Sequence, residues 1–209
     1  MGFYARRVLP HIIDLVMRDK ETTRIRAEVI PRAQGIVLEV GIGSGLNLPF
    51  YSAGVARVYG VDPSPELLEM ARKRAAAAPV GVEFLSQTAE EWLPLDDQSI
   101  DTVVITWTLC SIPDASKALQ QVKRVLKPTG QVIFVEHGLA PDAGVRSWQN
   151  WINPLWRPVA GGCNLNRKID DLIGSAGFEI TELKTTYLPG PRPLTYTYQG
   201  LARHPHGEA

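Results

Sequence analysis

The stretch V-L-E-V-G-I-G-S-G, residues 37–45, decides the fold of this chain. It predicts a short apolar strand that runs into three alternate glycines, which let backbone N–H groups approach a ligand closely. Further along, Asp62 ends a second apolar run, V-Y-G-V-D. An acidic residue at that position can accept hydrogen bonds from ribose hydroxyls. The two features together predict a site for a nucleoside cofactor.

The spacing of the glycines argues against a dinucleotide. A dinucleotide fingerprint reads G-x-G-x-x-G, whereas here Gly41, Gly43 and Gly45 alternate and Leu46 follows. Glu39 would repel a pyrophosphate, but it would attract an ammonium or sulfonium group. The loop therefore favours a cationic, amino-acid-like ligand. A plain glycine turn with a helix-capping aspartate is the alternative.

Length and composition set further bounds. With 209 residues and an apolar fraction of 44%, residues 1–209 are expected to form one domain. Lys and Arg together number 22, as do Asp and Glu, so no basic excess points to a nucleic-acid partner. Cys110 and Cys163 lie in different segments without metal-ligand spacing, which predicts reduced thiols, no metal site and a cytoplasmic protein. The apolar run 8–17 is shorter than the roughly 20 residues that span a bilayer.

Strand and helix signals alternate along the chain. Right-handed crossovers then place helices on both faces of a largely parallel sheet, with ligands beyond the carboxyl ends of its strands. Near the carboxyl terminus, a tryptophan-rich segment and a helix closed by Gly177 precede a terminal hairpin. The expected strands are 36–40, 55–61, 82–85, 100–106, 131–135, 178–183 and 195–202, and the expected helices include 65–78 and 115–127.

The glycine loop with Asp62 resembles motif I of the class I S-adenosylmethionine-dependent methyltransferases. That resemblance implies a Rossmann-like α/β fold, with a seven-stranded, mostly parallel sheet and an antiparallel terminal strand. It implies S-adenosylmethionine as cofactor. The implied cofactor-binding residues are Glu39, Gly41, Gly43, Gly45, Asp62, Pro63, Thr88, Ala89 and Thr106. Thr88 stands where such enzymes often have an aspartate. Two interpretations of this segment therefore remain, a contact to the adenine amine or a polar loop exposed to solvent.

Three further motifs carry a narrower resemblance. They are T-W-T-L-C-S-I-P-D, F-V-E-H-G and the tail S-W-Q-N-W-I-N-P-L-W-R-P-V-A-G-G-C-N-L-N-R. These are similar to a group that includes the mammalian alkyl-thiol S-methyltransferases and bacterial relatives. The resemblance implies methylation of a small, lipophilic thiol. The mammalian members carry a hydrophobic N-terminal membrane segment that is missing here, which leaves peripheral membrane contact as an open alternative.

His137 is the predicted general base, because it ends the fifth strand at the ligand edge and imidazole titrates near neutral pH. A histidine satisfied by backbone bonds is the alternative. Tyr4, Trp107, Trp148 and Arg167 are the predicted substrate contacts. The tryptophans could instead pack on the sheet, and Arg167 could cap a helix. Residues 1–34 are expected to form a helical segment that closes over the site as a lid.

The acceptor is the least determined feature. A thiol suits the chain because its pKa near 8.5 leaves enough thiolate at neutral pH without a metal or a carboxylate pair. N-methylation of a phospholipid amine and C-methylation of a quinone-like ring are alternatives. The glycine spacing disfavours an NAD-dependent oxidoreductase, which is the second functional class considered. A cofactor-binding module without enzymatic activity is the third. The sequence leaves the oligomeric state open.

Overall fold

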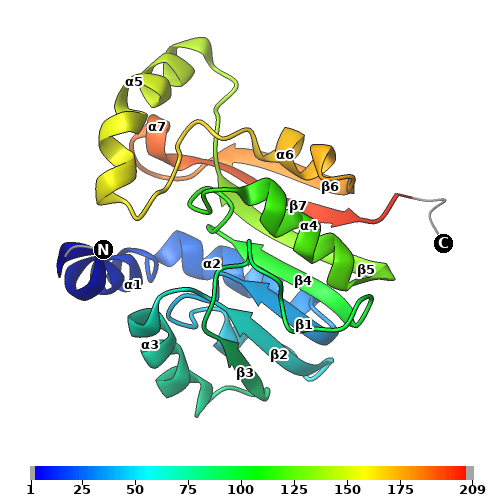
Figure 1. Cartoon of the computed structure of the whole chain (residues 1–209). Coiled ribbons are helices and arrows are strands. Elements are labelled where there is room, and N and C mark those ends of the chain that lie inside the picture. The colour runs from blue at the N-terminus through cyan, green and yellow to red at the C-terminus, as the bar shows by residue number, and fades with distance from the viewer. Residues whose placement is uncertain (1–2, 206–209) are drawn as a thin grey trace.

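The computed structural model describes residues 3–205 and contains a seven-stranded sheet. Residues 1–2 and 206–209 of the expected domain lie outside the described part. The strand order is β3-β2-β1-β4-β5-β7-β6, and the first five strands run parallel. β7 is antiparallel to both β5 and β6 (Figure 1). The predicted fold class is confirmed, including the antiparallel terminal strand.

The bounds of the elements follow the sequence pattern closely. The strands are β1 Gly35–Val40, β2 Val55–Val61, β3 Val82–Leu85, β4 Ile100–Thr106, β5 Leu126–His137, β6 Glu179–Tyr187 and β7 Tyr196–Arg203. The α-helices are α1 Leu9–Val16, α2 Lys20–Val29, α3 Pro65–Ala75, α4 Ala115–Val125, α5 Ala143–Val159, α6 Ile169–Ser175 and α7 Arg192–Thr195. Shorter turns of helix are η1 Tyr4–Val8, η2 Ile30–Arg32 and η3 Leu48–Phe50.

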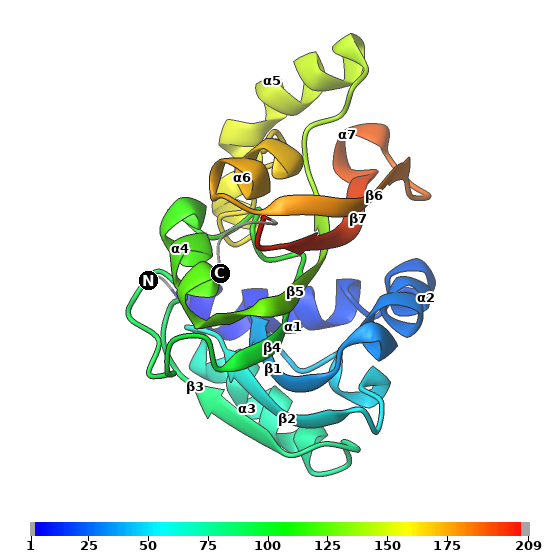
Figure 2. The ribbon, with the colours of Figure 1, turned by 90° about the vertical axis from the view of Figure 1, so that its right-hand side faces the viewer.

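Helices cover both faces of the sheet (Figure 2). On one face, side chains of α4 and α6 such as Leu119 and Ile173 join one buried apolar cluster. On the other, Ile25 and Val29 of α2 and Leu68 of α3 join a second cluster. Because β1 and β4 are buried along most of their length and lie between these layers, they form the centre of the sheet.

The largest differences from the sequence prediction are the start of β5 and the end of β6, which reaches Tyr187 rather than residue 183. β5 begins at Leu126 rather than at residue 131, since Leu126 pairs with Ile100 before the register shifts and Gln131 pairs with Thr102. Residues 127–130, including the expected turn, therefore bulge out of an otherwise continuous strand.

The N-terminal helices pack against the glycine loop that follows β1. Asp14 of α1 forms an ion pair with Arg74, at 2.8 Å, and the Arg74 guanidinium also donates to the backbone carbonyl of Ser44 in that loop. Asp14 is itself only 7% exposed. The segment thus lies at the carboxyl edge of the parallel strands, where a lid would have to lie. No helix within residues 3–205 is long and apolar enough to cross a membrane.

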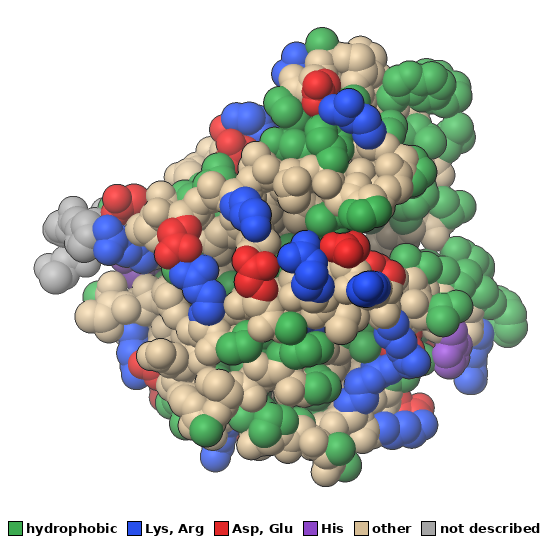
Figure 3. Space-filling view, turned by 180° about the vertical axis from the view of Figure 1, so that it is seen from behind, with side chains coloured by type: hydrophobic (Ala, Val, Ile, Leu, Met, Phe, Trp, Pro, Cys, Tyr) green, Lys and Arg blue, Asp and Glu red, His purple; other side chains and the backbone are tan. Residues whose placement is uncertain are grey.

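Helices α1 and α5 both present apolar side chains to solvent. The Tyr4 hydroxyl donates to the carbonyl oxygen of Val159 at 2.9 Å, so the two segments lie side by side. Figure 3 shows hydrophobic side chains gathered along the corresponding edge of the molecule. The exposed residues are Phe3, Tyr4, Val8, Ile12, Leu15 and Val16 from the N-terminal segment and Trp148, Trp151, Leu155 and Val159 from α5.

Candidate active site

The glycine loop takes a backbone conformation that side chains disfavour. Gly41, Gly43 and Gly45 have φ of +70°, +54° and +80°. A Cβ at Gly41 would lie 2.2 Å from the Oγ1 atom of Thr108, whereas one at Gly43 would meet only the Gly41 carbonyl oxygen, at 3.9 Å. The loop is therefore packed tightly on its inner side and open at Gly43, where a ligand can approach the backbone.

Asp62 connects the end of β2 to this loop. Its Oδ2 atom accepts a hydrogen bond from Gly43 N at 3.0 Å, and Oδ1 accepts one from Ser64 N at 2.9 Å. A carboxylate offers about four acceptor positions, so about two remain for a ligand. Burial raises the pKa of Asp62, although both backbone bonds oppose that shift. This arrangement fits a pair of ribose hydroxyls. Pro63 follows on the surface.

Glu39 is buried at the end of β1, with 1% exposure. Its Oε1 atom accepts from Asn47 Nδ2 at 2.8 Å, and Oε2 accepts from the Tyr51 hydroxyl at 2.7 Å. Burial raises the pKa of Glu39 to about 7, against the effect of these bonds. Both oxygens have protein partners, so the carboxylate would act on a bound cation chiefly through its charge.

Arg26 of α2 is a site residue that the sequence analysis missed. Its Nε atom donates to Asn47 Oδ1 at 3.1 Å, and its guanidinium lies 4.8 Å from the centre of the Trp107 ring. Asn47 Nδ2 also donates to Thr106 Oγ1 at 3.0 Å. Arg26 has no distinguishing motif around it, so only the packing of α2 on the loop identifies it. The network places Thr106 and Trp107 together with Glu39.

Trp107 has a backbone φ of +51°, which is rare for an aromatic residue. Its N–H donates to the Val135 carbonyl oxygen at 2.7 Å, so the chain turns sharply as β4 ends. Such strain commonly accompanies binding sites. The half-buried ring remains a candidate wall of the substrate pocket.

Thr88 and Ala89 follow β3, at the same edge of the sheet. The Thr88 hydroxyl donates to Glu90 Oε2 at 2.9 Å, and Ala89 is buried at 5% exposure. Glu90 Oε1 accepts from Asp114 N at 2.7 Å, which ties this turn to the start of α4. The turn lies where an adenine contact is expected, but the Thr88 hydroxyl is already engaged within the protein.

Glu136 is the second residue that the sequence analysis did not include in the site. It is fully buried and accepts hydrogen bonds from three successive backbone N–H groups, those of Thr108, Leu109 and Cys110, at 2.6, 2.9 and 3.3 Å. Burial raises its pKa to about 7 even though these bonds lower it. The carboxylate therefore fixes the loop after β4 against the end of β5.

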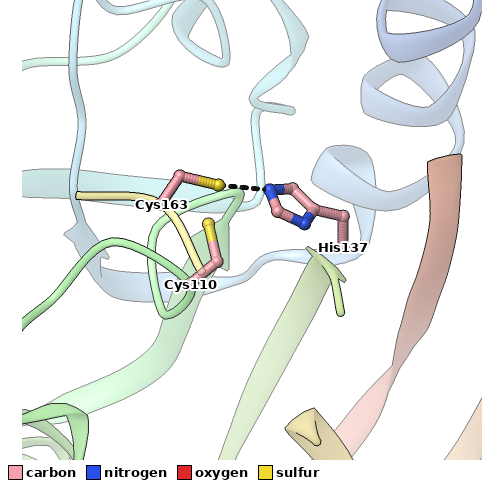
Figure 4. A group of neighbouring side chains, drawn as sticks. All are labelled: Cys110, His137 and Cys163. Carbon is pink, nitrogen blue, oxygen red and sulfur yellow. Dashed lines mark hydrogen bonds between the residues drawn. The ribbon is translucent and has the colours of Figure 1, made fainter. Parts of the chain in front are cut away.

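His137, Cys110 and Cys163 converge from three separate segments (Figure 4). His137 Nε2 lies 2.7 Å from Cys163 Sγ. A hydrogen bond with Cys110 lowers the pKa of Cys163, and so do His137 and Trp156, although burial opposes them. Burial alone would lower the pKa of His137, but the Cys163 sulfur raises it. The pair therefore favours an imidazolium beside a thiolate. The cysteines, expected to be unrelated, lie in one cluster because the tail returns to the strand edge.

Of the remaining substrate candidates, Arg167 lies beside this cluster, whereas Trp148 and Tyr4 lie on α5 and in the N-terminal segment. Arg167 donates from one guanidinium nitrogen to the carbonyl oxygens of Leu109 and Ile112, so it supports the loop after β4. It does not cap a helix, since α6 begins at Ile169. Trp148 is 59% exposed on α5 and packs against Trp151, with 5.3 Å between ring centres. Tyr4 is part of the N-terminal segment beside α5.

Comparison with known proteins identifies close relatives of the chain. A family profile described as "Methyltransferase domain" matches residues 38–134. The thiol S-methyltransferase TMT1B of Rattus norvegicus is 36% identical over 71% of this chain, and the human thiol S-methyltransferase TMT1A is 33% identical over 80%. The matches span 62% and 71% of those two proteins. A phosphatidylethanolamine N-methyltransferase of Cereibacter sphaeroides is 38% identical over 53% of the chain and 54% of its own length.

Solved structures agree on the fold. A S-adenosylmethionine-dependent methyltransferase of Leishmania major superimposes with a TM-score of 0.70, at 18% identity, covering 96% of this chain and 80% of that one. At this identity the similarity speaks for the architecture alone.

Proposed function

Since the chain belongs to the class I S-adenosylmethionine-dependent methyltransferases, we propose that it transfers a methyl group to the sulfur of a small, lipophilic thiol. The main support for a thiol acceptor is the sequence identity to two thiol S-methyltransferases, which extends over 71% and 80% of the chain. The segments that hold His137, Cys110 and Cys163 fall within the three motifs typical of that group.

The glycine loop and Asp62 fit the cofactor. Asp62 retains about two acceptor positions for a ribose diol, and the open backbone at Gly43 allows close approach. The charge of Glu39 suits the cationic amino-acid end of the molecule. When bound, S-adenosylmethionine supplies an electrophilic methyl group on a sulfonium. Thr88 and Ala89 are proposed to border the adenine, and Thr106 and Trp107 to border the methionine portion.

His137 stays the candidate general base in this proposal. It ends β5 at the edge where the acceptor would lie, and a thiol has to lose only one proton of pKa near 8.5. In the free protein its Nε2 atom faces Cys163 Sγ. Proton transfer from the acceptor to Nε2 therefore requires that the imidazolium first return its proton to the Cys163 thiolate and that this contact open.

The N-terminal segment is proposed to act as a lid. Asp14 forms an ion pair with Arg74 beside the glycine loop, and Arg26 packs over Trp107, and these contacts of α1 and α2 support the proposal. The exposed apolar side chains of α1 and α5 would also suit contact with a lipid surface that holds a lipophilic acceptor. Sedimentation with and without phosphatidylcholine vesicles tests that contact, and equal amounts in both supernatants would exclude it.

A matched acceptor panel tests the function. The purified chain is incubated with S-adenosylmethionine and with hexanethiol, hexylamine, phosphatidylethanolamine vesicles or a quinol, and the methylated products are identified by mass spectrometry. We expect methyl hexyl sulfide as the main product, and none from Asp62→Ala. Methylation of the phospholipid amine alone would instead support the N-methyltransferase alternative, which the Cereibacter relative favours.

A cofactor comparison separates the other classes. Calorimetry is expected to show binding of S-adenosylhomocysteine and no binding of NADH. Binding of NADH alone would revive the oxidoreductase alternative, and binding of S-adenosylhomocysteine with no product from any acceptor would support a binding module.

A further inference from the structure

Cys110, His137 and Cys163 bring two sulfurs and one imidazole nitrogen to a single point at the carboxyl edge of β4 and β5 (Figure 4). We propose that these three side chains bind a zinc ion with one coordination position left open, and that the open position takes the sulfur of the acceptor thiol. The second part rests on the proposed function, whereas the first part stands without it.

The geometry of the cluster suits a tetrahedral ion. The three ligand atoms lie within 4.8 Å of one another. Zinc binds sulfur at about 2.3 Å and imidazole nitrogen at about 2.0 to 2.1 Å, so tetrahedral angles place sulfur and nitrogen about 3.6 Å apart. Cys163 Sγ and His137 Nε2 now lie 2.7 Å apart, so they must separate by about 0.9 Å. A small rotation of one side chain provides that movement.

The backbone around the cluster is held in place by other groups. Cys110 N donates to the buried Glu136 carboxylate, and Cys110 O accepts from both the backbone N and the Nδ2 atom of Asn164, each at 2.8 Å. Asn164 follows Cys163 directly, so the two cysteine segments are tied together. Ligands positioned in this way need little rearrangement when an ion binds.

Trp156 offers a second observation beside the cluster. Its buried indole Nε1 has no hydrogen-bond partner within the described part of the chain, and Trp156 is one of the side chains that lower the pKa of Cys163. An unpaired buried donor is unfavourable. A metal-bound thiolate is an acceptor that would satisfy it.

The charges of the site also favour zinc. Two thiolates balance the two positive charges of the ion, which makes the buried complex neutral. Two thiolates and an imidazole are a common zinc donor set, and three protein ligands with one open position are typical of catalytic rather than structural zinc.

The open coordination position would let the zinc ion bind and activate the acceptor thiol. When the acceptor thiol binds there, its S–H bond breaks, the proton passes to water, and the sulfur keeps its electron pair and forms a bond to zinc. The bound sulfur is then a thiolate at neutral pH, ready to act as the nucleophile, and His137 serves as a ligand instead of a base.

Metal binding is tested on the reduced full-length chain, titrated with Zn²⁺ and separately with Co²⁺. We expect one equivalent of either ion and a sulfur-to-cobalt charge-transfer band. Cys110→Ser, Cys163→Ser and His137→Ala should each lose most of the binding, while His11→Ala, an exposed histidine outside the cluster, should keep it. Calorimetry with S-adenosylhomocysteine shows that each variant is folded.

Several outcomes would overturn the proposal. Reduced, folded wild type that binds no more metal than His137→Ala would exclude the zinc site and leave a cysteine–histidine pair. A cobalt spectrum unchanged by hexanethiol would exclude the acceptor position. Metal binding without thiol methylation would refute the proposed function alone, and undiminished methylation by metal-free protein would refute the catalytic zinc alone.

Discussion

Replacement of Asp62 by asparagine is expected to weaken cofactor binding. In the free protein each carboxylate oxygen accepts one backbone N–H, from Gly43 and Ser64, and about two acceptor positions remain for the ribose. The amide keeps one oxygen. It therefore loses one ribose hydrogen bond and one of the two backbone bonds, and it makes the remaining ribose bond without a full charge.

The magnitude follows from these bonds. Hydrogen bonds to a charged group contribute about 1.5 to 3 kcal/mol each, and neutral ones about 1 kcal/mol. Loss of one charged bond and weakening of the other should reduce binding by about 2 to 4 kcal/mol, or about 30- to 900-fold in Kd. Calorimetry with S-adenosylhomocysteine measures this change.

A second ligand tests the assignment to the ribose. An analogue without the 2′-hydroxyl should bind wild type more weakly, but should lose less than the full ligand on Asp62→Asn. Asp96→Asn, in an exposed turn, is the matched control and should bind as wild type does. Affinity of Asp62→Asn within threefold of wild type, with the fold intact, would refute the role assigned to Asp62.

Three further predictions follow. Because burial raises the pKa of Glu39 to about 7, its carboxylate forms as pH rises, and affinity for S-adenosylhomocysteine should increase between pH 6.0 and 7.4 by at most about eightfold. The affinity of Glu39→Gln should not change over this pH range. A pH dependence equal to that of wild type would assign the effect to another titratable group. Gly41→Ala should lower both Tm and cofactor affinity, because its Cβ would lie 2.2 Å from Thr108 at positive φ; Gly81→Ala, with open space around it, should change neither. Arg26→Met should destabilise the fold by about 2 to 3 kcal/mol in urea unfolding, since it leaves buried polar partners unsatisfied, and a change below about 0.5 kcal/mol would contradict that network.

The sequence predicted a glycine loop and an acidic residue that the structure brings together, since Asp62 accepts a hydrogen bond from Gly43 N. Residues 37–45 and Asp62 are local signals, because a strand, a tight turn and a following acid are encoded over short distances. The parallel order of the strands then brings Glu39, Asp62 and Thr106 to one edge without any further information. These are the positions where pattern and tertiary structure agree.

The acceptor half depended on contacts between distant segments. Arg26 has no motif of its own, and its role emerges only because α2 packs on Asn47 and Trp107. Arg167 is a predicted substrate contact, and no local pattern indicates that one of its guanidinium nitrogens donates to the carbonyl oxygens of Leu109 and Ile112.

By itself the sequence determined the sheet, the glycine loop and the acid that borders it, because short-range periodicity and turn chemistry specify them. Only the tertiary structure decided that Cys110 and Cys163 meet at His137. Residues so far apart in sequence share no local pattern. Their meeting depends on the tail returning across the strand edge, where Asn164 ties it to the loop after β4.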